Sequence, residues 1–216
     1  MQRFFSTVIA LVIATGFTAG ARAQSAKYHD AMKQSVDQLD TAHTVASMVD
    51  LANRFERIAD AEKTQGLPYY YAAYCQLMSV MLGTDKTKAD EIADKAETLI
   101  SKAESLDKPT SETYVIRSMI ATCHLMVDPQ NRYMQYGAAS GEAIQKSEQL
   151  DPGNPRPVYL EGQSKFYTPE AFGGGKAVAK PIFEKAKTMF ASFKPASDIA
   201  PQWGAHATDY FLSMCN

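Results

Sequence analysis

Hydrophobic residues recur along the chain at intervals of three and four positions. The clearest stretch runs from Ala89 to Leu106, where apolar residues occupy positions 89, 92, 93, 96, 99, 100, 103 and 106 and charged residues fill most of the others. This spacing places the apolar residues on one face of an α-helix. No stretch shows sustained alternation of apolar and polar residues, so the sequence predicts an all-α protein with essentially no strand.

A sequence repeat of about 44 residues runs through the same region. The segment ISKAESLD, which begins at Ile100, shares five identical positions with IQKSEQLD, which begins at Ile144. An aromatic residue also opens each apolar-periodic stretch, at Tyr28, Tyr70, Tyr114, Tyr159 and Trp203. Intervals of 42 to 45 residues between these aromatics are typical of a unit made of two helices joined by a turn.

The pattern predicts four helix pairs, at residues 26–63, 68–106, 111–150 and 155–193, and a single helix at 201–214. Each pair has an apolar stripe that it cannot bury alone, so the pairs are expected to stack and the last helix to cap the stack. Asn154 and Pro155 form a helix cap followed by proline at the first helical position. Pro181 implies that the last long helix either starts near Lys180 or is kinked.

The second helices of these pairs carry the small and large apolar residues of a known repeat. The matching positions are Ala96, Ile100, Ala103, Leu106 and Asp107, then Ser140, Ile144, Ser147, Leu150, Asp151 and Pro152, and finally Ala179, Phe183 and Ala186. In these residues the chain resembles the tetratricopeptide repeat (TPR) family, as an exported bacterial protein with units longer than the usual 34 or so residues. The resemblance implies a TPR-like α-solenoid of about four helix pairs plus a C-terminal capping helix, covering residues 24–216.

Proteins of this family act chiefly as scaffolds. The resemblance therefore implies a binding module for a protein or peptide, held on the surface that the first helix of each pair lines, without catalytic activity. On that surface the residues expected to contact the partner are Tyr69, Tyr71, Gln76, Arg117 and Lys165, whereas Tyr70 and Tyr74 are expected in the core. The alternative is a small-molecule-binding or transport accessory protein of the cell envelope, prompted by the segment TPEAFGGG at residues 168–175.

The first residues have the pattern of a secretory signal peptide. Arg3 precedes an apolar run from Phe4 to Phe17, and the small-residue end Ala-Arg-Ala predicts cleavage between Ala23 and Gln24. The apolar run is too short to cross a bilayer. Residues 1–23 are therefore interpreted as a signal peptide, and the mature protein is expected to be periplasmic or secreted.

Charge and cysteine content narrow the partner classes. Lys and Arg total 22 against 24 Asp and Glu, which leaves no electrostatic signature for nucleic acid or anionic lipid. Cys75, Cys123 and Cys215 are an odd number of thiols in an exported chain. Three buried thiols, a bridge between Cys75 and Cys123, and a dimer through Cys215 all remain open.

The remaining candidate chemistry is limited to one glycine-rich loop. Gly173, Gly174, Gly175 and Lys176 precede a predicted helix, where free amides can hold an anion, although a tight loop with close backbone packing is the competing interpretation. The four histidines are scattered, and no nucleophile motif is present in the sequence. We therefore expect no catalytic residue, no metal site and no cofactor.

Overall fold

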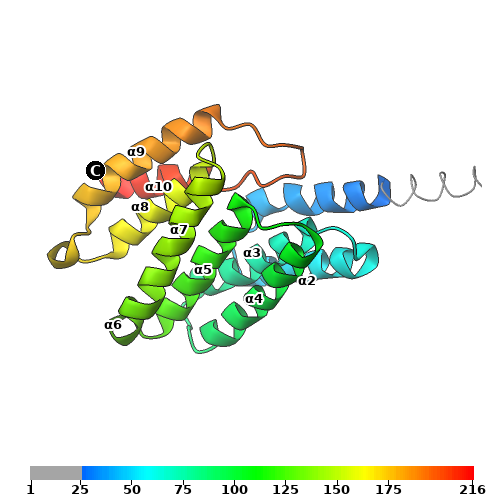
Figure 1. Cartoon of the computed structure of the whole chain (residues 1–216), viewed down its shortest axis with the longest axis horizontal. Coiled ribbons are helices and arrows are strands. Elements are labelled where there is room, and N and C mark those ends of the chain that lie inside the picture. Colours follow the sequence, from blue (N-terminus) through cyan, green and yellow to red (C-terminus); the bar gives the residue numbers. More distant parts are fainter. Residues whose placement is uncertain (1–25) are drawn as a thin grey trace, which may run out of the picture.

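The computed structural model describes residues 26–216, and this part of the chain is built from helices without a β-strand (Figure 1). The all-α prediction is confirmed. The signal-peptide prediction for residues 1–23 and its cleavage site lie outside the described residues. The first helix spans residues 26–37. It is followed by η1 (Leu39–Thr41), α2 (Val45–Glu62), α3 (Leu67–Leu82), α4 (Ala89–Leu106), α5 (Ser111–Val127), α6 (Pro129–Arg132), the π-helical turn η2 (Tyr133–Gly137), α7 (Ala138–Leu150), α8 (Pro155–Tyr167), η3 (Glu170–Phe172), α9 (Lys176–Ser192) and α10 (Ala205–Met214).

Local capping explains where several of these helices begin. The side chains of Thr44 and Thr110 each accept a hydrogen bond from the backbone N–H of the third helical residue. The side chain of that third residue in turn accepts from the backbone N–H of the threonine. Asn154 caps α8 with Pro155 at the first helical position, as predicted. Helix α9 begins at Lys176 and contains Pro181, so the later start near Lys180 is not observed.

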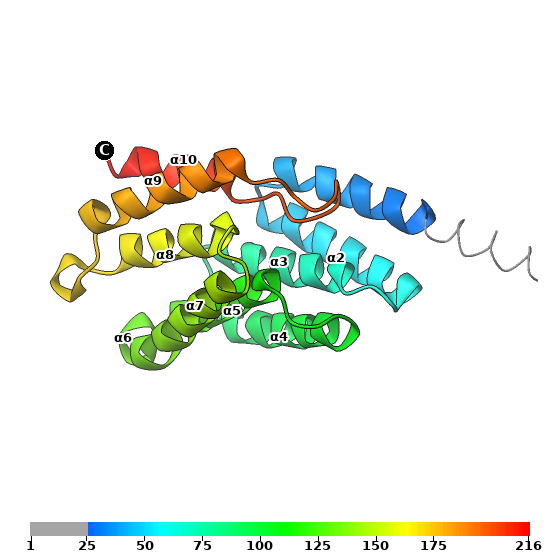
Figure 2. The same ribbon diagram turned by 45° about the horizontal axis from the view of Figure 1, so that its top comes forward.

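The helices pack mainly on their neighbours along the chain. Contacts join α2 to α3, α3 to α4, α4 to α5, α5 to α7, α7 to α8, α8 to α9 and α9 to α10, and additional contacts join α3 to α5 and α5 to α8 (Figures 1 and 2). The predicted pairs at 68–106, 111–150 and 155–193 therefore correspond to observed neighbours, and α10 packs against α9 of the last pair. That these pairs follow TPR geometry in detail stays a prediction.

The connection between α9 and α10, residues 193–204, crosses back over the early helices. It runs beside the first helix, where Asp198 contacts the His29 ring at 3.0 Å (Figure 2). The Tyr71 hydroxyl donates to the carbonyl of Ile199 at 2.8 Å, and Trp203 donates to the Tyr70 hydroxyl at 2.9 Å. These contacts cover the tyrosine-rich face of α3.

A buried arginine holds this connection in place. The Arg156 side chain is fully buried and donates to the Glu112 carboxylate at 2.9 Å and to the carbonyl of Pro201. Its guanidinium also lies over the rings of Phe193 and Trp203, at 4.8 and 5.4 Å from their centroids. Arg156 therefore ties α8, α5 and the α9–α10 connection together.

Replacing Arg156 by alanine should destabilise the protein by about 3–5 kcal/mol, because Glu112 loses its cationic partner and the buried carbonyl of Pro201 loses a donor. Urea unfolding monitored by circular dichroism measures this change. Arg57→Ala is the matched control, since Arg57 is exposed and should cost less than about 0.5 kcal/mol. Equal effects of the two substitutions would contradict a central role for Arg156.

Candidate ligand-binding site

The structure does not gather the predicted partner residues of α3 on an open face. Tyr71 is 0% exposed and stacks on Phe55, with ring centroids 4.9 Å apart. Gln76 is also buried and donates to Glu56 at 3.2 Å, while Tyr69 is only partly exposed and packs on the core. The expectation that Tyr71 is exposed was wrong, because the α9–α10 connection covers this side of α3.

The other two predicted partner residues lie apart from α3. Arg117 on α5 donates to Glu97 at 2.7 Å and to Glu104 at 2.5 Å, and these bonds, foremost that to Glu104, raise the pKa of its guanidinium. Lys165 lies on the last turn of α8 and is partly exposed. A shared partner surface for all five predicted residues is therefore not supported.

The glycine-rich loop is a tight turn with its amides already bonded. The amides of Gly173, Gly174 and Gly175 donate to the carbonyls of Glu170, Pro169 and Lys165. A Cβ at Gly174 would approach the Thr168 carbonyl to 2.2 Å, so the chain passes too close for any side chain. These amides are not free for an anion, which favours the close-packing interpretation over the predicted site at Gly173–Lys176.

Metal-ligating and thiol groups do not converge. Within residues 26–216 no group of three His, Cys, Asp or Glu side chains is arranged to hold a metal ion. All three cysteines lie in this range and are free thiols, and burial raises the pKa of Cys123 to about 12. None of the helices in the described range has the length and apolar character of a membrane span.

Four aromatic rings, two of them exposed, gather where α8 meets α10. Phe166 and Tyr167 end α8, Tyr210 and Phe211 lie on α10, and the four side chains form what we call the aromatic patch. The Phe211 ring contacts Phe166, Tyr167 and Tyr210 with centroids 5.3 to 5.9 Å apart. Tyr167 and Tyr210 are nevertheless 70% and 62% exposed. Large rings left in water at one place are typical of a binding surface.

The aromatic patch is anchored in the core. Phe211 itself is buried and stacks on Phe183 at 5.3 Å, and Phe183 is fully buried. Phe183 fits there because residue 162 is glycine, since a Cβ at that position would lie 2.6 Å from its ring. Burial raises the pKa of Tyr167, and the nearby Tyr210 raises it further. The two exposed tyrosines therefore both pack against Phe211, a ring that is anchored in the core.

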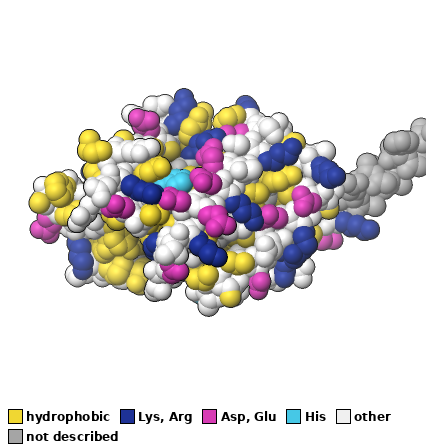
Figure 3. Space-filling view, turned by 90° about the horizontal axis from the view of Figure 1, so that it is seen from below, with side chains coloured by type: hydrophobic (Ala, Val, Ile, Leu, Met, Phe, Trp, Pro, Cys, Tyr) yellow, Lys and Arg dark blue, Asp and Glu magenta, His cyan; other side chains and the backbone are white. Residues whose placement is uncertain are grey.

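Sequence reasoning missed this patch. The signal in the sequence is two pairs of adjacent aromatic residues, Phe166-Tyr167 and Tyr210-Phe211. The second pair begins 44 residues after the first. Figure 3 shows hydrophobic side chains gathered toward the end of the molecule that α8, α9 and α10 occupy. The balance of charge also differs between the two parts of the chain. Residues 155–216 contain seven Lys and Arg and five Asp and Glu, whereas residues 24–154 contain 13 Lys and Arg and 19 Asp and Glu.

A concave surface lies between α4 and α7, with α5 as its base. We call it the α4–α5–α7 groove, and its volume is about 580 Å³. Its lining residues are Asp94, Glu97, Tyr114, Arg117, Ile120, Ala121, His124, Tyr136, Ala139, Glu142, Ala143 and Lys146. This volume is within the range of small-ligand pockets.

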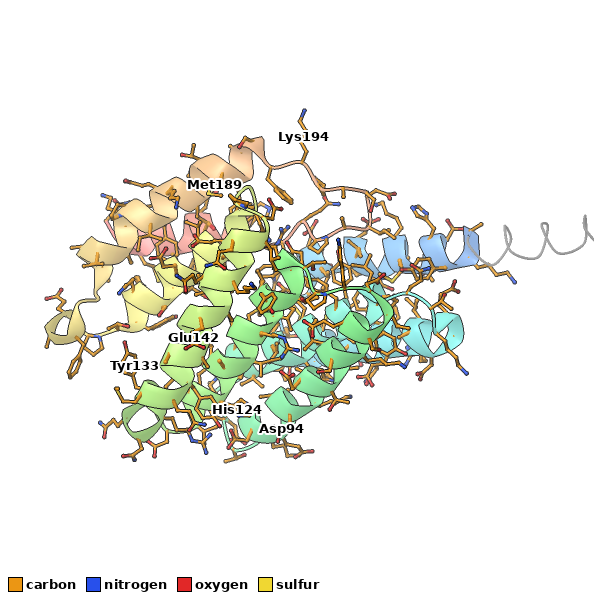
Figure 4. All side chains as sticks on the ribbon, viewed as in Figure 1. Asp94, His124, Tyr133, Glu142, Met189 and Lys194 are labelled. Carbon is orange, nitrogen blue, oxygen red and sulfur yellow. The ribbon has the colours of Figure 1, made fainter. Side chains whose placement is uncertain are left out.

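One end of the groove is held by a charged cluster. Asp90 accepts from Arg132 at 2.7 Å and contacts the Nδ1 atom of His124 at 2.7 Å, and the hydrogen bonds from Arg132 and then His124 lower the pKa of Asp90 to about 2. The His124 ring stacks on Tyr136, 4.8 Å between centroids. Figure 4 shows Asp94 beside His124. The cluster thus fixes η2 against α4 and α5.

Comparison with known proteins gives one informative match. No protein-family model matches the chain, and no curated protein is similar enough to match. The chain is similar to the solved structure of the HusA haemophore from Porphyromonas gingivalis, with 36% sequence identity and a TM-score of 0.78. The matched region covers 87% of this chain and 92% of that chain.

The Asp90 cluster predicts a defined pH dependence. Because the pKa of Asp90 is lowered on folding from 3.8 to about 2, its contribution is fully present above pH 4 and is lost as the pH falls from 4 to 2. Asp90→Asn should therefore lower stability at pH 7 by less than about 1 kcal/mol, since the group is partly exposed. Urea unfolding of both proteins at pH 7, 4 and 2 tests this, and a difference that persists at pH 2 would contradict it.

Proposed function

We propose that this chain, which belongs to the family of the HusA haemophore, is an exported carrier that binds haem on the aromatic patch. The proposal takes up the small-molecule alternative rather than the protein-scaffold function predicted from the sequence. It gives the chain a binding role without catalysis. The TPR-like stacking of helix pairs then serves as the frame that positions α8 and α10.

The exposed rings of Tyr167 and Tyr210 are the observation that carries this assignment. Haem is a wide, flat and largely apolar macrocycle, and aromatic side chains offer flat apolar faces of matching character. The two tyrosines already stand in water at 70% and 62% exposure, so haem would cover rings that the folded chain leaves open. Because Phe211 packs against both rings, their positions are set before the ligand arrives.

Charge supports the same location. Haem carries two propionate groups, which are anionic at neutral pH and favour a basic surrounding. The aromatic patch lies in the C-terminal segment, residues 155–216, whose Lys and Arg outnumber its acidic residues. Lys165 is on the same last turn of α8 as Phe166 and Tyr167, which makes it the candidate contact for a propionate.

Helix α10 also carries side chains of the types that bind haem iron. His206, Tyr210 and Met214 follow one another at intervals of four residues, and this spacing lines them along one face of the helix. Histidine, tyrosine and methionine all serve as axial ligands in haem proteins. A haem lying over Tyr210 is therefore one helical turn from the imidazole nitrogens of His206 and one turn from the sulfur of Met214.

The proposed cellular location is inferred from residues 1–23. We propose that residues 1–23 direct export and are removed before Gln24, and that the mature chain acts in the periplasm or outside the cell. A carrier in either place meets haem outside the inner membrane. The absence of a membrane-span candidate in residues 26–216 agrees with this proposal.

Haem titration of the mature chain tests the assignment. Absorbance in the Soret region should change saturably with the parent protein, and Tyr167→Ser combined with Tyr210→Ser should weaken binding about tenfold or more, because two ring contacts are lost. Both side chains are largely exposed, so the fold should be retained.

Tyr133→Ser is the matched control, since Tyr133 is an exposed tyrosine of η2 outside the aromatic patch. It should bind haem like the parent. Haem affinity that is unchanged in the double variant would remove the aromatic patch as the site. A parent protein that shows no saturable change would overturn the haem-carrier proposal itself.

A further inference from the structure

The α4–α5–α7 groove has the length of a short helix. Tyr114 and Lys146 line one end, and His124 and Tyr136 line the other. Ten residues separate the two ends on α5, and ten residues separate them on the η2–α7 side, which corresponds to about 15 Å along each helix axis. An elongated groove of this length accommodates about ten residues of a helical segment.

The groove has an apolar floor between aromatic ends. Ile120 and Ala121 come from α5, and Ala139 and Ala143 come from α7. Alanine side chains are short, so Ala121, Ala139 and Ala143 add little bulk to this apolar surface. This arrangement is the one in which an amphipathic helix lays its apolar face into a receptor surface.

Two exposed apolar side chains lie on η2, the segment that also carries the lining residue Tyr136. Met134 of η2 is 83% exposed and Tyr133 is 48% exposed. A π-helical turn is rare and often occurs at functional positions, and here it contains Tyr133, Met134 and the lining residue Tyr136. Methionine and tyrosine are enriched in protein–protein interfaces, where they fill apolar contacts.

The rim of the groove is acidic. Its α4 side contributes Asp94 and Glu97 and no basic lining residue, and α7 contributes Glu142 and Lys146. Arg117 is already paired with Glu97 and Glu104. Glu142 is exposed and has no hydrogen-bond or ion-pair partner within residues 26–216, and Asp94 lies 3.7 Å from the Nε2 atom of His124. Glu142 therefore carries an unpaired negative charge on the α7 side, and on the α4 side Asp94 faces the His124 ring while Glu97 and Glu104 share the single charge of Arg117.

We propose that the α4–α5–α7 groove docks a basic amphipathic helix of a partner protein, about ten residues long, with an apolar stripe flanked by Lys or Arg. The apolar stripe lies on the alanine floor, and the basic side chains meet Asp94 and Glu142. Haem is the wrong occupant because its propionates would face this acidic rim. The groove is therefore a separate surface from the aromatic patch, and its role does not depend on haem binding.

Two synthetic helix-forming peptides of about 14 residues test the proposal, one made of Leu and Lys and one with Glu in place of each Lys. Fluorescence anisotropy at about 50 mM salt, where charges are weakly screened, measures their affinity for the mature chain. We expect saturable binding of the Lys peptide and at least about tenfold weaker binding of the Glu peptide. Equal affinities, or no saturable binding of the Lys peptide up to 1 mM, would overturn the proposal.

Matched variants locate the binding. Asp94→Asn with Glu142→Gln should weaken the Lys peptide about tenfold, whereas Asp40→Asn with Asp60→Asn removes the same charge at exposed positions elsewhere and should change affinity less than about twofold. Ala139→Gln should block the floor, and Ala138→Gln, a neighbouring exposed position outside the lining, should not.

Loss of binding in the control variants to the same degree would assign the effect to overall charge and overturn the proposal. Self-association of the chain that disappears in Ala139→Gln, without Lys-peptide binding, would assign the groove to a second copy instead. Haem titration of the groove variants should match the parent, so failure of this proposal is distinguishable from failure of the haem assignment.

Discussion

The buried guanidinium of Arg156 is the constraint on which the C-terminal half of the structure depends. A charged group inside the protein is costly unless it is paired and hydrogen-bonded. Here Glu112, the Pro201 carbonyl and the rings of Phe193 and Trp203 together compensate that cost. These partners come from segments far apart in the sequence, so pairing the terminal nitrogens of this one side chain fixes the path of the α9–α10 connection. The position of α10 follows from that path.

A continuous series of aromatic contacts carries this order to the surface. Trp203 stacks on Tyr74 of α3 and contacts Tyr159 of α8, and Tyr159 contacts Phe211 of α10. Phe211 in turn supports Tyr167. Aromatic side chains have few rotatable bonds, so a packed series of them loses little further entropy when a ligand binds. The exposed rings are therefore pre-organised by contacts that reach the centre of the protein.

The sequence predicted what depends on local periodicity and missed what depends on distant packing. Helical stripes and the 44-residue repeat gave the all-α fold and the pairs, and Ala103 is buried as its place in the stripe indicated. Helix α3 gave a false signal, because it is apolar on almost every side and periodicity cannot identify an open face on such a helix. Tyr71 is covered by Ile199, 128 residues away. Nothing in the local pattern of residues 193–204 predicts that contact.

The two surfaces differ in charge in a way that suits two different occupants. The aromatic patch lies in the segment where basic residues are in excess, and the α4–α5–α7 groove carries Asp94, Glu97 and the unpaired Glu142 on its rim. If one surface bound both an anionic macrocycle and a basic helix, the lysines of the helix would pair with the propionates of the macrocycle instead of with the acidic residues of the groove. Separate surfaces avoid that competition, because each charge faces its opposite at a different place on the same rigid frame.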